Sequence, residues 1–393
     1  MILLTGGTGF LGGSFYLDAI KNGTAADCLL LIRGADEAAC RARLATNLMR
    51  CVDRATAQAY ADLCQIIPGD LQSLATSTDP RLDAVTHIVH VAADTSFDSR
   101  HSVWQINVDG TLALAARARR MKHLQRFLHI GTAFCCGETP WLEMVEEAPA
   151  PGHDTPHIVE YTRSKAAAER ALAAGFPDLP IVVCRPSIVV GHTAMGVRPS
   201  ASIFWFFRLV DRTGVLPCSP DGFIDIVPVD WASARLHDLL RKPELKHNLY
   251  HISAGLGSRT TWSDFQAAFA AHGHEGTRPY SFFDPKGPEG WKPFDRAFRL
   301  AFPQRDILHR TMMAGGRKYH RFTAQDIAFD NSRLLAEGFT PPPRFADYIG
   351  VCLTNPGTTI AEQFVDDAAS FEFDELLSSN AEAPAGSPAT AAA

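Results

Sequence analysis

The sequence lacks an excess of basic residues. It carries 37 lysines and arginines against 43 aspartates and glutamates, a formal net charge of −6. Proteins that bind nucleic acid neutralise backbone phosphates with clustered lysine and arginine, and an acidic chain of ordinary composition offers no such surface. Nucleic acid is therefore not an expected partner, and any positive patch has to be local.

The sequence also lacks cysteine pairs with metal-binding or redox spacing. Its nine cysteines are odd in number and include no CxxC pair. A disulfide framework uses an even set of cysteines, and structural zinc sites use closely spaced pairs. We therefore expect reduced thiols, no metal site and a cytoplasmic location.

Long hydrophobic runs are absent as well. The longest apolar stretch, residues 203–210, includes Arg208 and is far shorter than the ~20 residues that span a bilayer. The first residues read directly as a buried strand, without a basic leader and a small-residue cleavage site. We expect no transmembrane segment, no secretion signal and no domain before this first strand.

What is present is an alternation of short apolar runs with longer amphipathic segments, in a chain of 393 residues that is 46% hydrophobic. Segments 37–48 and 108–118 have helical apolar spacing, and the runs between such segments have the length of strands. This alternation predicts the α/β class with a Rossmann-type, doubly wound parallel sheet. The expected strands lie at residues 2–4, 29–32, 66–67, 88–91, 127–130 and 181–184.

The alternation becomes irregular after about residue 191, where proline and glycine recur among aromatic residues. We predict a Rossmann domain over 1–200, with strands at 224–229 and 249–252 returning to it from the 222–255 region. A smaller, interleaved C-terminal substrate-binding region then covers 201–377. Residues 378–393 are rich in alanine, proline and serine and are predicted to be a disordered tail.

A glycine-rich turn follows the first strand and opens a helix. The segment TGGTGFLGG places Gly6, Gly9 and Gly12 at three-residue spacing. Such a turn lets a pyrophosphate approach the bare backbone and the free N–H groups of the helix N-terminus. Strand, glycines and helix occur in the required order, so the segment predicts dinucleotide binding. The candidate contacts are Thr5, Gly6, Gly9, Phe10, Leu11 and Gly12.

The ends of the next strands indicate which dinucleotide binds. Arg33 stands at the end of the second strand, where an acidic residue would favour NAD and an arginine favours the 2′-phosphate of NADPH. Arg41 or Arg43 is a candidate second contact to that phosphate, with a solvated charge as the alternative for Arg41. We also expect Asp70 and Leu71 near the adenine and Ala92 and Ala93 beside the cofactor. His90, in the same run as these alanines, is expected to be a core residue.

Tyr161 and Lys165 lie four residues apart in YTRSK, within a helix predicted over 159–174. This spacing puts the phenol and the ammonium on one helical face, where the cation is expected to lower the tyrosine pKa. Thr132, just after a strand, can offer a hydroxyl to the same substrate oxygen. Asn107, on an earlier helix, is expected to order a water or to hold the lysine region. These four residues form the predicted catalytic set.

Together these motifs resemble the extended short-chain dehydrogenase/reductase superfamily over residues 5–191, and its thioester-reductase and fatty acyl-CoA reductase branch in particular. The matching runs include HVAADTSF, INVDGT, YTRSK with Glu169, and CRPSIVVG. The resemblance implies catalytic roles for Thr132, Tyr161 and Lys165 and cofactor contacts that extend to Pro186 and Ile188. One departure is Gly131, where relatives often carry a serine, so a single hydroxyl remains beside the substrate.

The resemblance implies an NADPH-dependent reductase that converts an acyl thioester, on coenzyme A or a carrier protein, to an aldehyde. A second reduction to the alcohol is left open. Since no carrier domain is expected upstream, the substrate would arrive in trans. Two alternatives stay open: a nucleotide-sugar epimerase or dehydratase, and a non-catalytic NADP-binding regulator. The oligomeric state is not decided, and a homodimer is one option.

Two further segments bear on the substrate. Residues 203–210 could line an acyl-chain groove, although a helix core is the favoured interpretation. Residues 292–321 carry eight lysines and arginines against Asp295 and Asp306, a local surplus of six positive charges. Such a surface would attract coenzyme A phosphates or an acidic carrier protein, with solvated surface charges as the equal alternative.

Overall fold

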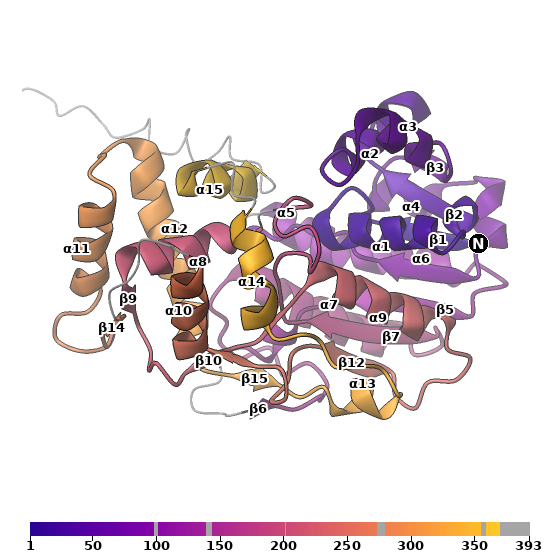
Figure 1. Ribbon diagram of the computed structural model, residues 1–393. Helices are drawn as coiled ribbons and strands as arrows, with labels where there is room; N and C mark the ends of the chain where they lie inside the picture. The colour runs from indigo at the N-terminus through magenta and orange to yellow at the C-terminus, as the bar shows by residue number, and fades with distance from the viewer. Residues whose placement is uncertain (98–100, 139–143, 201, 273–279, 355–358, 370–393) are drawn as a thin grey trace, which may run out of the picture.

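The computed structural model describes residues 1–97, 101–138, 144–200, 202–272, 280–354 and 359–369 (Figure 1). The predicted tail, residues 378–393, lies outside the described part. Within the described residues, no helix is both long enough and apolar enough to cross a membrane.

The centre of the molecule is a seven-stranded sheet in which every pairing is parallel. The predicted doubly wound sheet is confirmed. Its order is β12-β7-β5-β4-β1-β2-β3, so the chain moves outward in one direction through β2 and β3 and in the other through β4. This reversal places a topological switch point between β1 and β4, where doubly wound sheets bind their ligands. The strands are β1 (Ile2–Thr5), β2 (Cys28–Ile32), β3 (Gln65–Pro68), β4 (His87–His90), β5 (Arg126–Ile130), β7 (Ile181–Pro186) and β12 (Leu249–Ile252).

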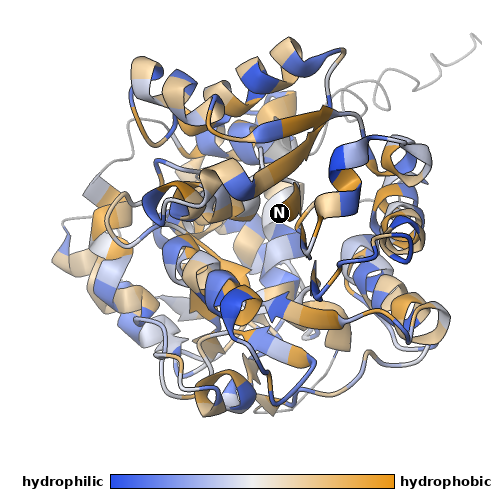
Figure 2. Cartoon of the chain, turned by 90° about the vertical axis from the view of Figure 1, so that its right-hand side faces the viewer, coloured by the Kyte–Doolittle hydropathy of each residue, from blue (hydrophilic) through white to orange (hydrophobic). Residues whose placement is uncertain are grey.

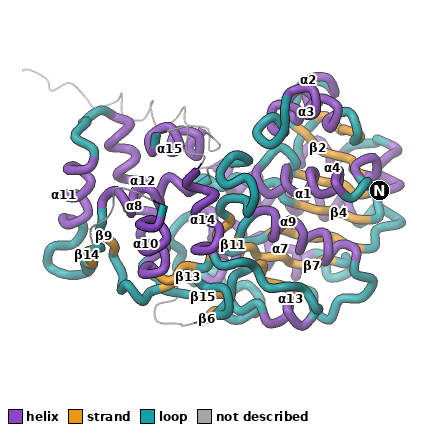
Figure 3. The backbone as a smooth tube through the Cα atoms, viewed as in Figure 1, coloured by secondary structure: helices purple, strands orange, loops and turns teal. Residues whose placement is uncertain are grey.

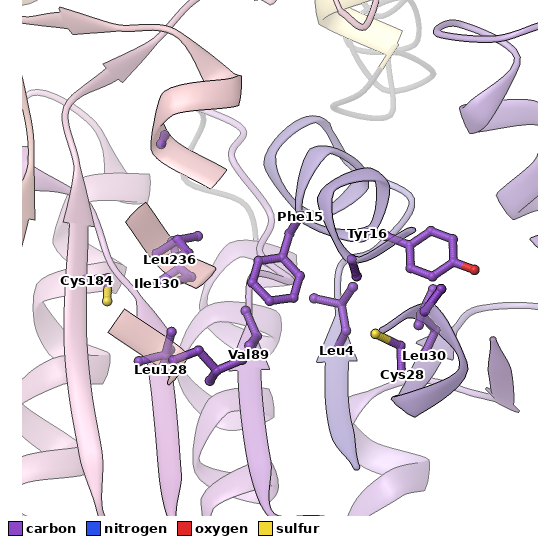
Figure 4. Packing of buried hydrophobic residues seen from close by; sticks show 14 of the residues in the cluster. Leu4, Phe15, Tyr16, Cys28, Leu30, Val89, Leu128, Ile130, Cys184 and Leu236 are labelled. Atoms are coloured by element: carbon purple, nitrogen blue, oxygen red, sulfur yellow. The ribbon is translucent and has the colours of Figure 1, made fainter. Parts of the chain in front are cut away.

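Helices cover both faces of this sheet, which is why its strands are continuous apolar runs rather than alternating ones. On one face, Phe15 of α1 and Leu236 of α9 pack with Leu4 and Leu30 of the strands (Figure 4). On the other face, Leu114 contributes to the cluster around Leu3 and Leu29. Figure 2 shows the strands largely in hydrophobic colours and the helices in both. The helices of this part are α1 (Phe10–Lys21), α2 (Glu37–Leu48), α3 (Arg54–Ala61), α4 (Leu71–Thr76), α5 (His101–Trp104), α6 (Thr111–Ala118), α7 (Glu160–Gly175), α9 (Val229–Arg241) and α13 (Ser332–Ala336).

A second lobe, mostly helical, lies at the end of the molecule away from the N-terminus (Figure 3). Its core is a dense aromatic cluster that includes Trp205, Phe206 and Phe207 of α8, all essentially unexposed. The acyl-groove interpretation of 203–210 is therefore wrong, because these rings fill the core of the lobe. The helices here are α8 (Phe204–Thr213), α10 (Trp262–Ala271), α11 (Lys292–Ala301), α12 (Ile307–Thr323), α14 (Phe345–Thr354) and α15 (Ile360–Ala369).

Short strand pairs connect the two parts. The expected single strand over 224–229 is wrong: β10 and β11 are separated at Asp225 and pair with β13 and β8 outside the large sheet. The buried Asp225 carboxylate accepts backbone hydrogen bonds from Ala254, Gly255 and Phe329 at 2.7, 3.2 and 3.0 Å, which explains the break. The short strands are β6 (Met144–Val145), β8 (Ile188–Val189), β9 (Val215–Leu216), β10 (Phe223–Ile224), β11 (Ile226–Val227), β13 (Thr260–Thr261), β14 (Ser281–Phe282) and β15 (Ala328–Phe329).

Candidate active site

The glycine turn between β1 and α1 is tightly built against the end of β4. Gly6 has φ of +76°, and a Cβ there would lie 2.6 Å from the backbone nitrogen of Ala92. A Cβ on Gly12 would collide with the Gly6 carbonyl, whereas Gly9 has only that carbonyl near it. Gly6 and Gly12 are therefore needed for the turn, and Gly9 keeps its outer side clear. This is the bare cradle that a pyrophosphate requires.

Helix α1 begins at Phe10 without a side-chain cap. Its N-cap residue is Gly9, and no side chain accepts a hydrogen bond from the first N–H groups, which belong to Phe10, Leu11 and Gly12. Unpaired N–H groups and the positive end of the helix dipole suit an anion. The residues present therefore fit a dinucleotide, and these N–H groups are the ones that would hold its pyrophosphate.

The carboxyl ends of β1, β4 and β7 bring further candidates to the same edge of the sheet. Thr5 is buried and pairs in register with His90. Ala92 and Ala93 follow β4 and are partly exposed beside the glycine turn. Pro186 ends β7, and the backbone N–H of Ile188 donates to Asp225 at 3.2 Å.

The arginines after β2 separate into two groups. Arg33 is exposed at the end of β2, and the guanidinium of Arg43 reaches its carbonyl oxygen at 3.4 Å. Arg41 instead bonds the carbonyl of Ala61 at 2.5 Å and forms an ion pair with Glu37. Arg33 and Arg43 are thus the pair that could meet a 2′-phosphate, and Arg41 holds helices α2 and α3 together.

Asp70 and Leu71 stand where β3 ends. The Asp70 carboxylate accepts the backbone N–H of Ser73 at 2.8 Å and so caps helix α4, and this bond lowers the pKa of Asp70. Leu71 is buried against the sheet. The sequence did not reveal this capping role, although an aspartate three residues before a serine is a helix-start signal.

Helix α7, which carries Tyr161 and Lys165, packs along the segment after β5 that carries Thr132. Lys165 Nζ donates to the carbonyl of Ile130 at 2.7 Å, and Tyr161 lies near Cys135. Thr132 is buried and accepts the N–H of Phe134 at 3.4 Å, so its own proton remains available to a substrate oxygen. The candidate phenol and ammonium thus lie on a helix that packs against the segment of the candidate hydroxyl.

Burial shifts the pKa values of Tyr161 and Lys165 in opposite directions. It raises the pKa of Tyr161 well above its ordinary value of 10, and Cys135 adds to the rise. It lowers the pKa of Lys165 to about 8, with Glu169 acting against the change. The expected lowering of the tyrosine pKa by Lys165 is not found here, because burial is the largest cause of the shift and Cys135 acts in the same direction. The phenol therefore stays protonated at neutral pH and has a proton to donate.

The structure explains why a glycine stands at position 131, which is not apparent from the sequence. A Cβ at this position would collide with the carboxylate of Glu169, which forms an ion pair with Arg185 at 2.6 Å. Both side chains of the pair are at most 4% exposed, so the ion pair is enclosed between α7 and β7. The carboxylate occupies the space that a side chain at 131 would need.

Asn107 lies in a π-helical turn, Gln105–Gly110, that precedes α6. Its amide accepts the N–H of Asp94 at 2.8 Å and donates to the Asp94 carbonyl at 2.8 Å and to Ser164 Oγ at 2.9 Å. Both amide hydrogens are thus used by protein groups. Asn107 thus joins Asp94 to Ser164, the residue before Lys165.

A row of partly exposed aromatic rings begins beside Thr132. Phe134 packs against Phe322 of α12 with ring centroids 5.2 Å apart, Phe322 against Phe97 at 5.6 Å, and Phe97 against Tyr319 at 4.9 Å. We call these four residues the aromatic row. The aromatic row is not apparent from the sequence, because its four rings come from three distant segments. Only Phe134, two residues after Thr132, carried a signal.

All nine cysteines are free, and the described part of the chain holds no cluster of three or more His, Cys, Asp or Glu side chains arranged for a metal ion. The candidate site is therefore built from a dinucleotide cradle, a phenol, an amine and a hydroxyl.

Comparison with known proteins assigns the chain to a family. Residues 4–236 match the male sterility protein family. The chain is 28% identical over 249 residues to fatty acyl-CoA reductase 2 of Homo sapiens, covering 52% of this chain and 45% of that protein. It is 27% identical over 268 residues to aldehyde reductase lnaA of Aspergillus flavus, covering 64% of this chain and 25% of that protein. The chain thus spans less than half the length of these curated relatives.

Solved structures share the fold. The terminal R domain from the myxalamid PKS-NRPS pathway superposes with a TM-score of 0.71 at 20% identity, over 91% of this chain and 90% of that one. UDP-glucose 4-epimerase of Thermus thermophilus, in complex with NAD, gives 0.56 at 19% identity, over 90% and 97%. With the match over residues 4–236, the chain belongs to the male sterility protein family of extended short-chain dehydrogenases/reductases, which are NAD(P)-dependent oxidoreductases.

Proposed function

We propose that this protein is an NADPH-dependent reductase of acyl thioesters that releases an aldehyde. The observation that carries the proposal is that α7, with Tyr161 and Lys165, packs along the segment of Thr132 after β5, at the sheet edge that also carries a glycine turn fitted to a dinucleotide. The names of relatives support the thioester class, because they include fatty acyl-CoA reductases and a thiolation-reductase di-domain.

The chain's own groups suit this reaction. When bound, the cofactor would supply hydride to the thioester carbonyl carbon. The Tyr161 phenol would donate its proton to the carbonyl oxygen, and the Thr132 hydroxyl would donate a hydrogen bond to the same oxygen. The resulting hemithioacetal breaks its C–S bond and yields an aldehyde and a free thiol. Lys165, charged below pH 8, would hold the cofactor ribose.

The aromatic row supports an apolar acyl group. Phe134 lies two residues after Thr132, so a chain attached to the reacting carbonyl would pass over these rings, which remain partly exposed. Covering such rings removes apolar area from water at roughly 25 cal/mol per Å². The rings thus replace the rejected groove at 203–210 as the candidate acyl surface.

Preference for NADPH rests on Arg33 and Arg43. Arg33 follows β2, and Arg43 lies on α2 with its guanidinium 3.4 Å from the Arg33 carbonyl oxygen. Arg33 occupies the position where an acidic residue would bond a free ribose 2′-hydroxyl. This arrangement also argues against the epimerase alternative, since the epimerase of similar fold was solved with NAD.

The thiol component is proposed to be coenzyme A or a carrier protein that docks on α11 and the start of α12. Arg296, Arg299, Arg305 and Arg310 are exposed there and form no ion pair with any described residue. Arg317 and Arg321 are instead paired with Asp295 and Glu138. Leu300, which follows Arg299 in α11, is 80% exposed. A cytoplasmic location and a homodimer remain predictions.

The test mixes purified protein and NADPH with a panel of acyl-CoA and carrier-bound thioesters, and follows NADPH absorbance and thiol release together. The proposal expects one thiol for each NADPH in aldehyde formation. NADPH loss without thiol would contradict the thioester assignment, and NADPH binding without turnover on any thioester would favour the regulatory alternative.

A further inference from the structure

His90 occupies a polar position at the switch point of the sheet. It ends β4, has no exposed surface, and pairs in register with Thr5 of β1. Its Nδ1 lies 2.7 Å from Thr5 Oγ1 and its Nε2 lies 2.9 Å from Thr111 Oγ1. Both ring nitrogens are therefore hydrogen bonded, whereas both nitrogens of the buried His129 and His320 have no partner among the described residues.

The partners fix the direction of every hydrogen bond in this group. Thr111 Oγ1 donates its proton to the Asn107 carbonyl at 2.7 Å, so it can only accept from His90 Nε2. A neutral imidazole carries one N–H, and Nδ1 must therefore accept the proton of Thr5 Oγ1. Thr5 Oγ1 in turn accepts the backbone N–H of Ala92 at 3.3 Å. Each group in this series therefore donates to the next, from the Ala92 N–H to the Asn107 carbonyl.

The far end of this chain reaches the catalytic helix. Asn107 donates its amide to Ser164 Oγ at 2.9 Å, and Ser164 Oγ donates to the Tyr161 carbonyl at 2.7 Å. The near end touches the cofactor turn, because Ala92 lies against Gly6. Hydrogen bonds therefore run from Ala92, beside the dinucleotide cradle, to the backbone carbonyl of Asn107, and the side-chain amide of Asn107 continues them through Ser164 to the backbone carbonyl of Tyr161.

We propose that His90 is a positioning residue that couples the cofactor turn to the catalytic helix through Thr5, Thr111 and Asn107. It touches neither substrate nor cofactor; it holds Ala92 and the turn at the spacing that the pyrophosphate needs. The inference rests on the proposed function for its cofactor and for the role of Tyr161. It makes cofactor affinity depend on Thr111, which has no contact with the turn.

The coupling is expected to be independent of pH in the neutral range. Burial lowers the pKa of His90 to about 3, with Lys165 of α7 adding to the shift. The other titratable neighbour is His129 of β5, whose ring lies 5.6 Å away and whose pKa burial also lowers. The neutral ring is thus the form that acts, and the hydrogen-bond directions stay fixed.

The test measures the Kd for NADPH by fluorescence titration, without any thioester, in Thr111→Val, Thr5→Val and the double variant. Changes along a coupled network typically alter binding by ~3- to 30-fold, which is the rise expected for Thr111→Val. Thr111→Ser keeps the hydroxyl, and its Kd for NADPH should stay within about 2-fold of the wild-type value. Because the bonds act as a series, the double variant should bind no worse than the weaker single variant.

Thr260→Val is the control, since Thr260 is also buried and lies in β13, a short strand outside the large sheet. It should leave the Kd unchanged even where it alters the melting temperature. His90→Gln, which can keep one of the two bonds, is the second variant and should also raise the Kd. An unchanged Kd in folded Thr111→Val or His90→Gln, or additive effects in the double variant, overturns the coupling alone. A wild-type protein that binds no NADPH overturns the proposed function as well.

Discussion

Burial in the candidate site changes the pKa values of two neighbouring side chains in opposite directions. Tyr161 is kept protonated and Lys165 is brought to a pKa of about 8, although both lie on one face of α7. Burial disfavours the charged form of each group, which acts in opposite directions on an acid and a cation. The pair therefore offers a proton donor together with a cation whose charge is lost just above neutral pH.

Tyr161→Phe removes the proposed proton donor and keeps the ring. Turnover should fall by ~10²- to 10⁴-fold, the usual contribution of a positioned acid, while the Kd for NADPH changes little. Single-turnover rates and NADPH titration measure the two effects. A variant that keeps more than half of the wild-type rate would remove Tyr161 from the catalytic set.

The lowered pKa of Lys165 predicts that activity falls on the alkaline side of the pH profile. Its pKa is about 8, below its ordinary 10.5, so the ammonium is present below pH 8 and is lost as the pH rises through that value. The kcat/KM for the thioester should fall about tenfold per pH unit above 8. In Lys165→Arg, which stays charged, this fall should be absent. The same fall in both proteins would assign it to another group.

Arg33→Asp tests the cofactor preference. Losing a charge-assisted contact to the 2′-phosphate costs ~1.5 to 3 kcal/mol, so the ratio of NADPH to NADH efficiency should drop at least tenfold. Arg54→Asp makes the same charge change at an exposed arginine of α3 and should leave the ratio as it is. Equal ratios for Arg33→Asp and wild type would refute the assignment.

At the scale of elements, the sequence predicted what depends on local order along the chain. The apolar runs indicated the strands of the large sheet, and the glycine turn and the YTRSK helix had their elements correctly placed. What it could not provide depends on contacts between distant segments. The break at Asp225 is such a case, because the carboxylate is held by Ala254 and Phe329.

Gly131 is a second case. A glycine is needed at position 131 because the ion pair between Glu169 of α7 and Arg185 of β7 fills the space that a side chain would take. The aromatic row likewise unites rings from three segments. Spacing along one segment carries no information about contacts between distant segments, which is why the motifs and the elements that carry them could be predicted and the surfaces around them could not.

Gly131→Ser tests this packing. The new side chain would displace the Glu169 carboxylate and weaken a buried ion pair, so the free energy of unfolding should fall by ~2 to 4 kcal/mol in chemical denaturation. Gly152→Ser, at a glycine with open space around it, should change it by less than ~0.5 kcal/mol. Equal stability of the two variants would contradict the collision.

The whole molecule combines a sheet part with a helical lobe that carries an uneven charge. The chain is acidic overall, yet α11 and the following loop present arginines without ion-pair partners among the described residues. These lie far from the N-terminal end of the molecule in Figure 1. Cofactor binding and capture of the thioester's carrier are therefore expected to respond to different surfaces.

Arg296→Glu combined with Arg299→Glu should raise the KM for a coenzyme A or carrier-bound thioester by several-fold at low salt, and leave the Kd for NADPH unchanged. Added salt should narrow the difference, since it screens exposed charges. Arg54→Glu with Lys122→Glu gives the same change in net charge on the sheet part and is the control. Equal KM values for the two double variants would leave these arginines as solvated surface charges.

The central claim is hydride delivery to a thioester carbonyl beside Tyr161. The most direct measurement supplies NADPH deuterated at the nicotinamide C4 and an acyl-CoA, and analyses the product by mass spectrometry. The account predicts one deuterium on the former carbonyl carbon of the released aldehyde, one free thiol per aldehyde, and near loss of both in Tyr161→Phe. An aldehyde without deuterium, or oxidised cofactor without any reduced acyl product, would contradict it.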